Sequence, residues 1–390
     1  MKILSIFGTR PEAVKMAPVV QRLARTPGID SRVCVTAQHR QMLDQVLNLF
    51  GIQPDYDLDL MREDQSLAEL SAAIFTHLDP ILGDFEPDWV LVQGDTTTVA
   101  IASLLAYYRR IKVGHVEAGL RTHDKWQPFP EEINRRVAGV VADLHFAPTE
   151  QAQENLLREG ISDEDVAVTG NPVIDALQFV AEQPMPKEIR ELLEKLEIAL
   201  ASFDFTAASA VPLRKVHNDK YLILVTAHRR ENFGRPLENI CLALKELAAR
   251  GNVEIVYPVH LNPNVQEPVK RILGAVPHVT LLPPLDYLPL VHLQKRSRII
   301  LTDSGGIQEE APAFGVPVLV LREVTERPEG IAAGTLKLVG TETNKIVREA
   351  ARLLDDPTAY AEMAKAVNPF GDGHAAERIV AAIQEFSGRS

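Results

Sequence analysis

The chain has 390 residues, of which 46% are hydrophobic and 24% are charged. This balance excludes an intrinsically disordered chain, and the length predicts two domains of similar size. The formal net charge of −12 argues against a general nucleic-acid binder or a membrane-surface binder, although it leaves room for a local basic pocket.

The first residues read as a folded strand rather than a targeting signal. The apolar run that begins at Lys2 breaks at Gly8, so it is too short for a signal peptide. No apolar stretch approaches the roughly 20 residues that a membrane-spanning helix needs. Cys34 and Cys241 fall in different halves of the chain, so we expect no disulfide. These features predict a cytoplasmic protein without membrane segments.

Short apolar runs alternate with amphipathic helical patterns through the first half of the chain. Nearly continuous apolar strands separated by helices are typical of a parallel sheet that is covered on both faces. Helices are expected to begin near Pro11 and to span 39–50 and 97–108. The predicted strands are 2–7, 31–37, 89–93, 112–116, 144–147 and 166–168.

The same alternation restarts near Tyr221, which predicts a second doubly wound domain. The predicted strands there lie within 221–227, 254–260, 279–284, 298–304 and 317–321. The resulting division is a first domain at 1–182, a linker with some helix at 183–220, a second domain at 221–368, and a terminal helix at 375–388.

Polar and charged residues follow the predicted strands directly. In open parallel sheets, ligands bind at the carboxyl ends of the strands, so a ligand is expected in a cleft between the two domains. This clustering predicts an enzyme. The residues at these strand ends are Arg10, Asp95, Glu117, His228, His260 and Ser304.

A strand, two glycines and a helix follow one another at 298–314. Gly305 and Gly306 would let the backbone approach a ligand closely, and the helix N-terminus would offer free N–H groups to a phosphate. Glu309 or Glu310, one turn into the helix, could accept hydrogen bonds from both hydroxyls of a ribose. The alternative is that Ser304 only caps the helix and the glutamates only complement its dipole.

Two basic turns could bind a diphosphate. His228, Arg229 and Arg230 follow a buried strand, and Arg327 ends another strand-loop unit. Arginine can hold phosphate oxygens with two parallel hydrogen bonds. The alternatives are a solvated basic turn and, for Arg327, surface ion pairs with neighbouring glutamates.

Arg10 and Lys15 surround the start of the first helix, where both could reach an anion. The loop lacks the G-x-G-x-x-G spacing, which argues against an NAD-dependent dehydrogenase or epimerase. Asp95 and Glu117 follow strands, and Glu131 lies on one helix face with Arg135. Each acid alone could be a helix cap or a dipole partner, but three such acids together favour acid–base chemistry.

The motifs read in order resemble the non-hydrolysing UDP-N-acetylglucosamine 2-epimerase family. The resemblance covers the chain except for 190–219, and it implies an α/β fold of the GT-B type with two Rossmann-like domains and an interdomain cleft. It also implies a homodimer without metal or cofactor, and a C-terminal helix that packs back on the first domain. The motifs are GTRPEAVKMAP, TAQHRQMLDQVL, GDTTT, GHVEAGLRT, PEEINRR, TAHRREN, YPVH, LTDSGGIQEEAP, ERPEG and NPFGDG.

The resemblance also assigns roles to individual residues. Those that match catalytic positions are Asp95, Glu117, Glu131, Arg135 and His228. Those that match positions binding the UDP part of the substrate are Arg10, Lys15, Leu285, Leu290, Ser304, Gly305, Gly306, Glu310 and Arg327. Those that match a second, activating UDP-N-acetylglucosamine site of some bacterial members are Gln38, Gln41, Arg229 and His260. An arginine of that activating site corresponds here to Asp64, with Arg62 two residues away, so we expect weak activation.

The expected reaction interconverts UDP-N-acetylglucosamine and UDP-N-acetylmannosamine for cell-surface polysaccharide synthesis. Carbon 2 of the sugar has no adjacent carbonyl, so we expect UDP to be eliminated to a bound 2-acetamidoglucal and then added again. A GT-B glycosyltransferase, a hydrolysing epimerase and a catalytically silent UDP-sugar sensor are the alternatives. Products formed from UDP-N-acetylglucosamine alone would distinguish them.

Overall fold

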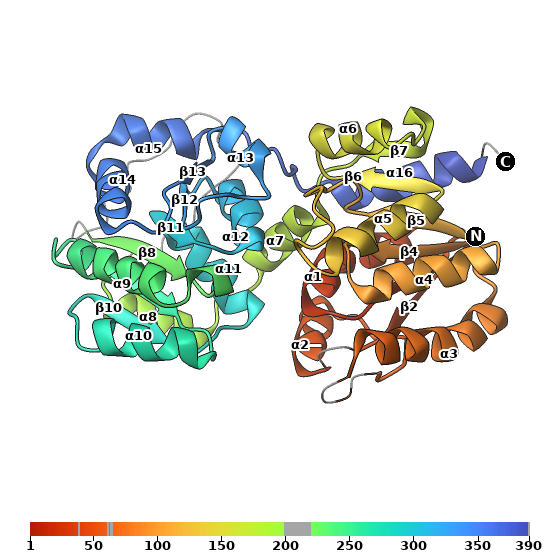
Figure 1. Ribbon diagram of the computed structural model, residues 1–390, viewed down its shortest axis with the longest axis horizontal. Coiled ribbons are helices and arrows are strands. Elements are labelled where there is room, and N and C mark those ends of the chain that lie inside the picture. Colours follow the sequence, from red (N-terminus) through yellow and green to blue (C-terminus); the bar gives the residue numbers. More distant parts are fainter. Residues whose placement is uncertain (38–39, 61, 63–64, 199–219, 389–390) are drawn as a thin grey trace. The chain divides into compact units, whose positions relative to one another are not determined.

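The computed structural model describes all residues except 38–39, 61, 63–64, 199–219 and 389–390. The chain forms two compact units (Figure 1). The first contains Met1–Gln178 together with Phe370–Ser390, and the second contains Phe179–Pro369. Each unit has a parallel sheet with helices on both faces, which confirms the predicted doubly wound α/β architecture.

The first unit has a seven-stranded sheet in the order β3-β2-β1-β4-β5-β6-β7. The direction of winding reverses between β1 and β4, which pair in parallel from Ile3 opposite Trp89. Loops that leave the sheet at such a reversal flank a natural ligand crevice. The strands are β1 (Lys2–Phe7), β2 (Asp30–Val35), β3 (Tyr56–Asp57), β4 (Trp89–Gln93), β5 (Lys112–Val116), β6 (Leu144–Ala147) and β7 (Val166–Val168).

The second unit has a six-stranded sheet in the order β10-β9-β8-β11-β12-β13. Its reversal lies between β8 and β11, so the turns that follow these two strands are neighbours. The strands are β8 (Tyr221–Thr226), β9 (Val253–Pro258), β10 (Val279–Leu282), β11 (Ile299–Thr302), β12 (Val318–Val320) and β13 (Leu336–Leu338).

The strands form where the sequence has uninterrupted apolar runs. Every residue of β4 is buried, as is every residue of β11, because helices cover both faces of each sheet. The predicted bounds of 2–7, 89–93 and 112–116 match the structure, whereas β2 begins at Asp30 and ends at Val35 rather than at Ala37.

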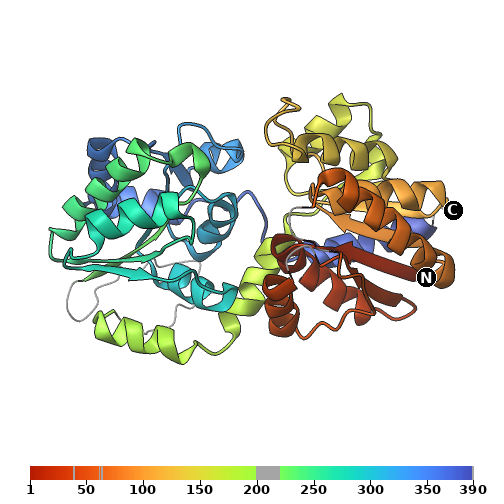
Figure 2. The same cartoon turned by 60° about the horizontal axis from the view of Figure 1, so that its bottom comes forward.

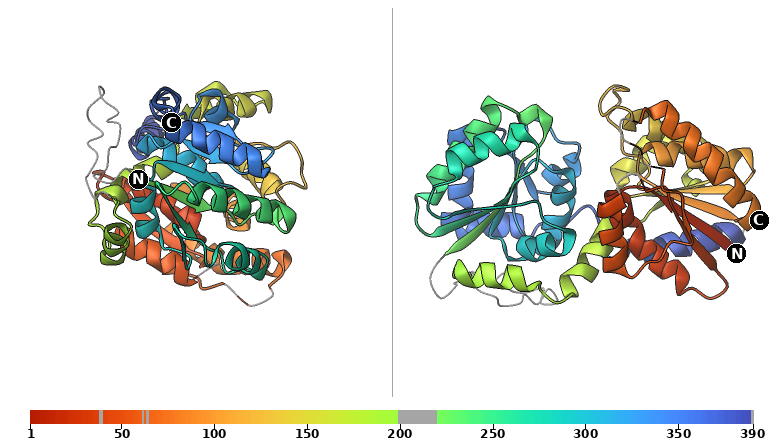
Figure 3. Two further views of the ribbon diagram at one scale, coloured as in Figure 1. Left: turned by 90° about the vertical axis from the view of Figure 1, so that its left-hand side faces the viewer. Right: turned by 90° about the horizontal axis from the view of Figure 1, so that it is seen from below.

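Helices α1, α2 and α16 lie on one face of the first sheet, and α3, α4 and α5 lie on the other (Figure 3). The terminal helix α16 packs directly on α1. The helical segments of this unit are α1 (Arg10–Ala24), α2 (Arg40–Phe50), α3 (Leu67–Phe85), α4 (Thr97–Tyr108), α5 (Glu131–Val141), α6 (Glu150–Arg158), η1 (Asp163–Asp165), α7 (Pro172–Glu182, which continues into the second unit) and α16 (Ala375–Gly388).

In the second unit, α9 packs against α10 and α14, and α11 packs against α8 (Figure 2). Helix α8 lies in the segment expected to be a linker, and its Ile189 and Leu193 are buried. The helical segments are α8 (Lys187–Lys195), η2 (Arg230–Asn232), α9 (Arg235–Ala248), α10 (Pro263–Leu273), α11 (Tyr287–Arg296), α12 (Gly305–Glu310), η3 (Ala311–Phe314), α13 (Pro328–Ala332), α14 (Thr343–Asp355) and α15 (Pro357–Ala364).

Both cysteines are free and buried, and burial raises the pKa of the Cys34 and Cys241 thiols to about 12. Within the described residues, no helix is both long enough and apolar enough to span a bilayer.

Candidate active site

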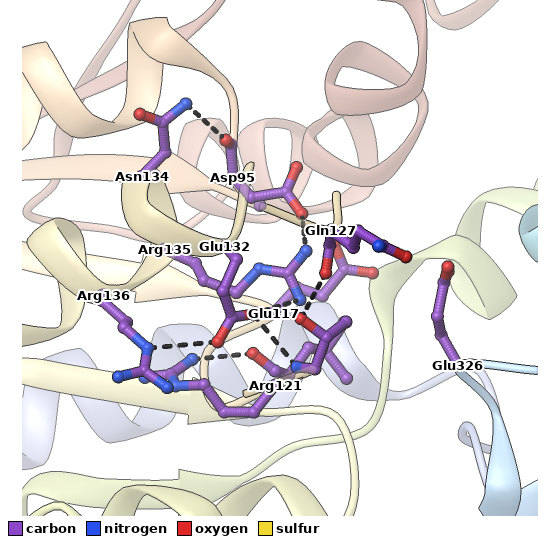
Figure 4. Close-up of polar contacts among 12 residues, drawn as sticks. Asp95, Glu117, Arg121, Gln127, Glu132, Asn134, Arg135, Arg136 and Glu326 are labelled. Carbon is purple, nitrogen blue, oxygen red and sulfur yellow. Dashed lines mark hydrogen bonds and ion pairs between the residues drawn. The ribbon is translucent and has the colours of Figure 1, made fainter. Parts of the chain in front are cut away.

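The first unit brings the predicted acids together at the carboxyl edge of its sheet. Asp95 follows β4, Glu117 follows β5, and Glu131 is the first residue of α5. Burial raises the pKa of Asp95, Arg135 opposes that rise, and the charges of Glu117 and Glu131 add to it. The charges of Glu117, Glu131 and Arg135 all act on Asp95, so these groups form one electrostatic cluster. Figure 4 shows Asp95 and Glu117 with Arg135.

Glu117 lies at the centre of this cluster and is 8% exposed. Its Oε1 is ion-paired with Lys15 and accepts a 2.8 Å hydrogen bond from Asn171, while its Oε2 accepts one of 2.5 Å from Gln93. The backbone φ of Glu117 is +64°, in the left-handed region that costs a non-glycine residue roughly 1–2 kcal/mol. The side chain is therefore aimed by both its partners and a strained backbone.

Asp95 is held by α5. Its Oδ2 accepts a 2.7 Å hydrogen bond from Arg135, and its backbone carbonyl accepts one of 3.0 Å from Asn134 (Figure 4). Asp95 is not the cap of α4, because Thr96 occupies that position and its side chain accepts from the Val99 N–H. The carboxyl group of Asp95 is thus available for a role other than capping.

Glu131 and Glu132 begin α5 but differ in their surroundings. Within the described part of the chain, the buried Oε2 of Glu131 has no hydrogen-bond partner. Glu132 is fully buried and accepts hydrogen bonds from the Thr122 and His123 backbones and from Arg136, at 3.0, 3.3 and 3.1 Å. Glu132 therefore fastens the loop that precedes α5, and Glu131 is the one with an unused acceptor.

The turn that carries Arg10 is built by a capping box. Thr9 and Glu12 cap the start of α1 reciprocally, and Glu12 also accepts a 2.6 Å hydrogen bond from Thr96 in the neighbouring turn. Glu12 is buried, and burial raises its pKa despite these hydrogen bonds. A Cβ at Gly8 would lie 2.0 Å from the Thr36 hydroxyl, so only glycine fits there.

Asp303 organises the basic turn of the second unit. Its Oδ2 accepts hydrogen bonds of 2.9 Å from the backbone N–H groups of His228 and Arg229 and from the Asn232 side chain. The rings of His228 and His260 are stacked with centroids 5.5 Å apart. Burial lowers the pKa of His228, although Asp303 opposes that shift.

The two glycines after β11 begin α12, as expected. Ser304 occupies the N-cap position without a side-chain capping hydrogen bond, which weighs against the capping alternative. Arg327 is ion-paired with the buried Glu309, and its guanidinium lies 3.5 Å from where a Cβ of Gly305 would stand. An anion above the N-terminus of α12 would therefore face both backbone N–H groups and an arginine.

Glu310 is 6% exposed and accepts hydrogen bonds from two neutral donors. Tyr287 donates to its Oε1 at 3.3 Å, and Gln294 donates to its Oε2 at 2.8 Å. Leu285 precedes α11, and Leu290 lies in the first turns of that helix, where its N–H bonds to the Asp286 carbonyl at 3.2 Å.

The residues expected to form an activating site are only partly described. Gln38 and Asp64 lie outside the described residues, and Gln41 belongs to α2, although its side chain is not described. Arg229 belongs to the basic turn of the second unit, and His260 stacks on His228 of that turn. Within the described ranges, no group of three or more His, Cys, Asp or Glu side chains could hold a metal ion.

Several polar residues of the site were not selected from the sequence. Asn171 and Gln93 contact Glu117 from positions far away in the chain, and an isolated amide carries no recognisable signal. Asp303 lies at the end of a predicted strand, and Gln294 lies in the helix α11. Their roles depend on which side chains the fold brings next to them.

Comparisons with known proteins agree over the full chain. The family model described as UDP-N-acetylglucosamine 2-epimerase matches residues 21–384. The UDP-N-acetylglucosamine 2-epimerases of Salmonella typhimurium and Escherichia coli K12 are 55% and 54% identical, with 99% and 98% of each chain covered. The epimerase of Neisseria meningitidis, solved bound to UDP-GlcNAc, has a TM-score of 0.86 and 49% identity, covering 99% of this chain and 100% of that one.

A more distant structure, the epimerase of Methanocaldococcus jannaschii in complex with UDP-GlcNAc and UDP, has a TM-score of 0.77 and 32% identity, covering 99% of this chain and 100% of that one. These likenesses confirm the predicted GT-B type fold. Taken with the family model that matches residues 21–384, they show that the chain belongs to the UDP-N-acetylglucosamine 2-epimerases, a family of isomerases.

Proposed function

We propose that the chain interconverts UDP-N-acetylglucosamine and UDP-N-acetylmannosamine without releasing free sugar. The observation that carries this proposal is the cluster of Asp95, Glu117 and Glu131 with Lys15 and Arg135 at one sheet edge. The UDP-GlcNAc bound to the Neisseria meningitidis relative supports the choice of substrate.

The chemistry of the sugar favours elimination over direct inversion. The proton on carbon 2 is not acidic, since no carbonyl is attached to that carbon. When a base removes it, the electrons of the C–H bond form a double bond between carbons 1 and 2, and the bond from carbon 1 to the UDP oxygen breaks. Adding UDP back to the bound 2-acetamidoglucal, with a proton delivered to the opposite face of carbon 2, gives the other epimer.

This route needs both an acid and a base near the sugar. Carboxyl groups in different environments can fill these roles, because their pKa values are pushed apart. The pKa of Asp95 is raised by burial and by its acidic neighbours, whereas Glu117 accepts hydrogen bonds from three donors. Glu131 supplies the third carboxyl, with an acceptor that no described group occupies.

The leaving UDP must be stabilised as its negative charge grows, and preorganised cations and N–H groups do this best. Glu310 would bind the ribose hydroxyls, and the backbone near Leu285 and Leu290 would meet the uracil. The residues proposed to surround the diphosphate are Arg10, Lys15, His228, Ser304, Gly305, Gly306 and Arg327.

The decisive experiment incubates the protein with UDP-N-acetylglucosamine alone in D₂O and follows the products by NMR. We expect UDP-N-acetylmannosamine that carries deuterium at carbon 2. Stoichiometric UDP with free N-acetylmannosamine would indicate a hydrolysing enzyme. Absence of turnover until an acceptor is supplied would indicate a glycosyltransferase, and binding with no reaction under any condition would indicate a sensor.

We further propose a cytoplasmic homodimer that supplies N-acetylmannosamine units for cell-surface polysaccharides. The family resemblance supports this setting, and light scattering on the purified protein tests the dimer. An activating site at Gln38, Gln41, Arg229 and His260 would be weakened by Asp64, because a carboxylate repels a diphosphate.

A further inference from the structure

Asn171 connects the proposed chemistry of Glu117 to the start of a helix. It lies between β7 and α7 and is 1% exposed. Its Oδ1 accepts a 3.1 Å hydrogen bond from the Val173 N–H, and its Nδ2 donates to Glu117 Oε1 at 2.8 Å. Since a backbone N–H can only donate, the contact with Val173 fixes which end of the amide faces the carboxylate.

The backbone of Asn171 is held by the returning C-terminal segment. Its N–H donates to the Phe370 carbonyl at 2.7 Å. Gly170 and Gly371 pack so closely that a Cβ on Gly170 would stand 3.2 Å from the Gly371 Cα. Both glycines also have positive φ, of +83° and +139°. A segment almost 200 residues away in the chain therefore sets the place of this side chain.

The returning segment is itself firmly attached within the first unit. The Asp175 carboxylate accepts hydrogen bonds from the Ala375 and Ala376 N–H groups at 3.1 and 2.9 Å. Arg378 donates a 3.1 Å hydrogen bond to the Thr169 carbonyl, and its pairing with Asp372 holds the guanidinium in place. These charge-assisted contacts make the segment a fixed support rather than a loose tail.

We propose that Asn171 is a positioning residue for the epimerisation, which holds the Glu117 carboxylate in its working direction, and that Phe370 fixes Asn171 in turn. An amide does not titrate, so it can orient a carboxylate without taking part in the proton transfer. Among the described residues, the charged or titratable groups that face Glu117 include Lys15 from α1, Asp95 after β4 and His115 in β5. This inference rests on the proposed role of Glu117 in the reaction.

The test separates orientation of Glu117 from support of α7. The change Asn171→Asp keeps an oxygen for the Val173 N–H but replaces the donor facing Glu117 by an anion. The change Asn171→Ser keeps a good helix cap but is too short to reach Glu117. Asn262→Asp is the matched control, because Asn262 precedes Pro263 and caps α10 through the same contact with the N–H two residues on.

We expect Asn171→Asp to lower kcat by about 10²-fold, as misplacement of a reacting group does, with KM and UDP affinity within about threefold of the parent. A second carboxylate beside Glu117 should also move the acid limb of the pH–kcat profile upward by about one pH unit. Asn171→Ser should lower kcat by about tenfold without moving that limb. Asn262→Asp should change neither quantity.

An unchanged kcat and acid limb in Asn171→Asp would overturn the inference, as would a loss confined to KM and UDP affinity. If Asn171→Asp does not fold by circular dichroism, Asn171→Ser decides, and parental kcat in that variant refutes the role. The incorporation of deuterium at carbon 2 by the parent protein distinguishes the proposed epimerase function from the proposed role of Asn171. Its absence would remove the proposed function, whereas its presence with fully active Asn171 variants would remove only this inference.

Discussion

Glu131 and Glu132 are adjacent glutamates, but substituting Glu132 should reduce stability, whereas substituting Glu131 should reduce kcat. Glu132 accepts four hydrogen bonds, two from backbone N–H groups, one from the Thr122 hydroxyl and one from Arg136, at 3.0 to 3.3 Å. Losing a hydrogen bond to a buried charge costs about 1.5–3 kcal/mol, and neighbouring losses do not add fully. We therefore expect Glu132→Ala to reduce the free energy of unfolding by about 3–5 kcal/mol.

Thermal unfolding is a direct assay for this loss. In a unit of about 200 residues, one kcal/mol shifts the midpoint by about 2–4 °C, so Glu132→Ala should melt roughly 10 °C below the parent. Glu131→Gln should melt with the parent but lose about 10²-fold in kcat, as expected for a group that transfers protons. Equal melting temperatures for Glu132→Ala and the parent, or equal destabilisation by both variants, would refute this division of roles.

The difference in melting temperature between the parent and Glu132→Ala should depend on pH in a defined direction. Burial alone would raise the pKa of Glu132, but hydrogen bonds from Thr122 and Arg136 and the charge of Arg135 outweigh it and lower the pKa below the usual 4.5. A carboxyl whose pKa is lowered by folding stabilises the protein above its unfolded pKa, and this stabilisation is lost as the pH falls through the folded value. The gap in melting temperature between the parent and Glu132→Ala should thus be full at pH 7 and shrink below about pH 4.5.

Four further outcomes are expected. Asp95→Asn and Glu117→Gln should each lower kcat by about 10²-fold while UDP binding, measured by calorimetry, stays within about threefold of the parent. Asp303→Ala should weaken UDP binding by about tenfold, because three donors of the basic turn lose their acceptor. Glu310→Gln should reduce the ratio of the affinities for UDP and 2′-deoxy-UDP, because Glu310 is proposed to bind the ribose hydroxyls. An equal ratio in the variant and the parent would contradict this role. Asp64→Arg should strengthen activation by UDP-N-acetylglucosamine in the reverse reaction, and strong sigmoidal kinetics in the parent would argue against the weakened site.

The fold was readable from the sequence where burial leaves a simple pattern. Strand β4 is buried along its whole length, so WVLVQ contains no polar residue until its last position. Helix α3 (Leu67–Phe85) was not anticipated, although Ser66 and Glu69 form a capping box that marks its start. The segment 183–220 was predicted to be a linker that contains some helix, without bounds for that helix. The packing of α8 on α11 depends on tertiary contacts that no local sequence pattern records.

The candidate site was predictable only for residues whose place follows from topology. Asp95 and Glu117 end neighbouring parallel strands, so their proximity follows from the order of the sheet. The contact between Asn171 and Glu117 does not, because it depends on the turn after β7 and on the returning segment at Phe370. The helical pattern alone did not separate Glu131 from Glu132, because adjacent helical residues differ only in the neighbours that packing gives them, and the family resemblance was needed to select Glu131.

Buried polar groups organise each half of the proposed site from within its own unit. Glu12 and Glu132 fasten turns around the acids of the first unit, and Asp303 fastens the basic turn of the second. Turns fixed in this way lose little conformational freedom when a ligand arrives, so less binding energy is spent on ordering them. More of it can then stabilise the transition state, in which negative charge moves onto the departing UDP. Residues that never touch the substrate should therefore influence kcat. For this reason Asn171→Asp is expected to lower kcat as much as a substitution of an acid that contacts the substrate.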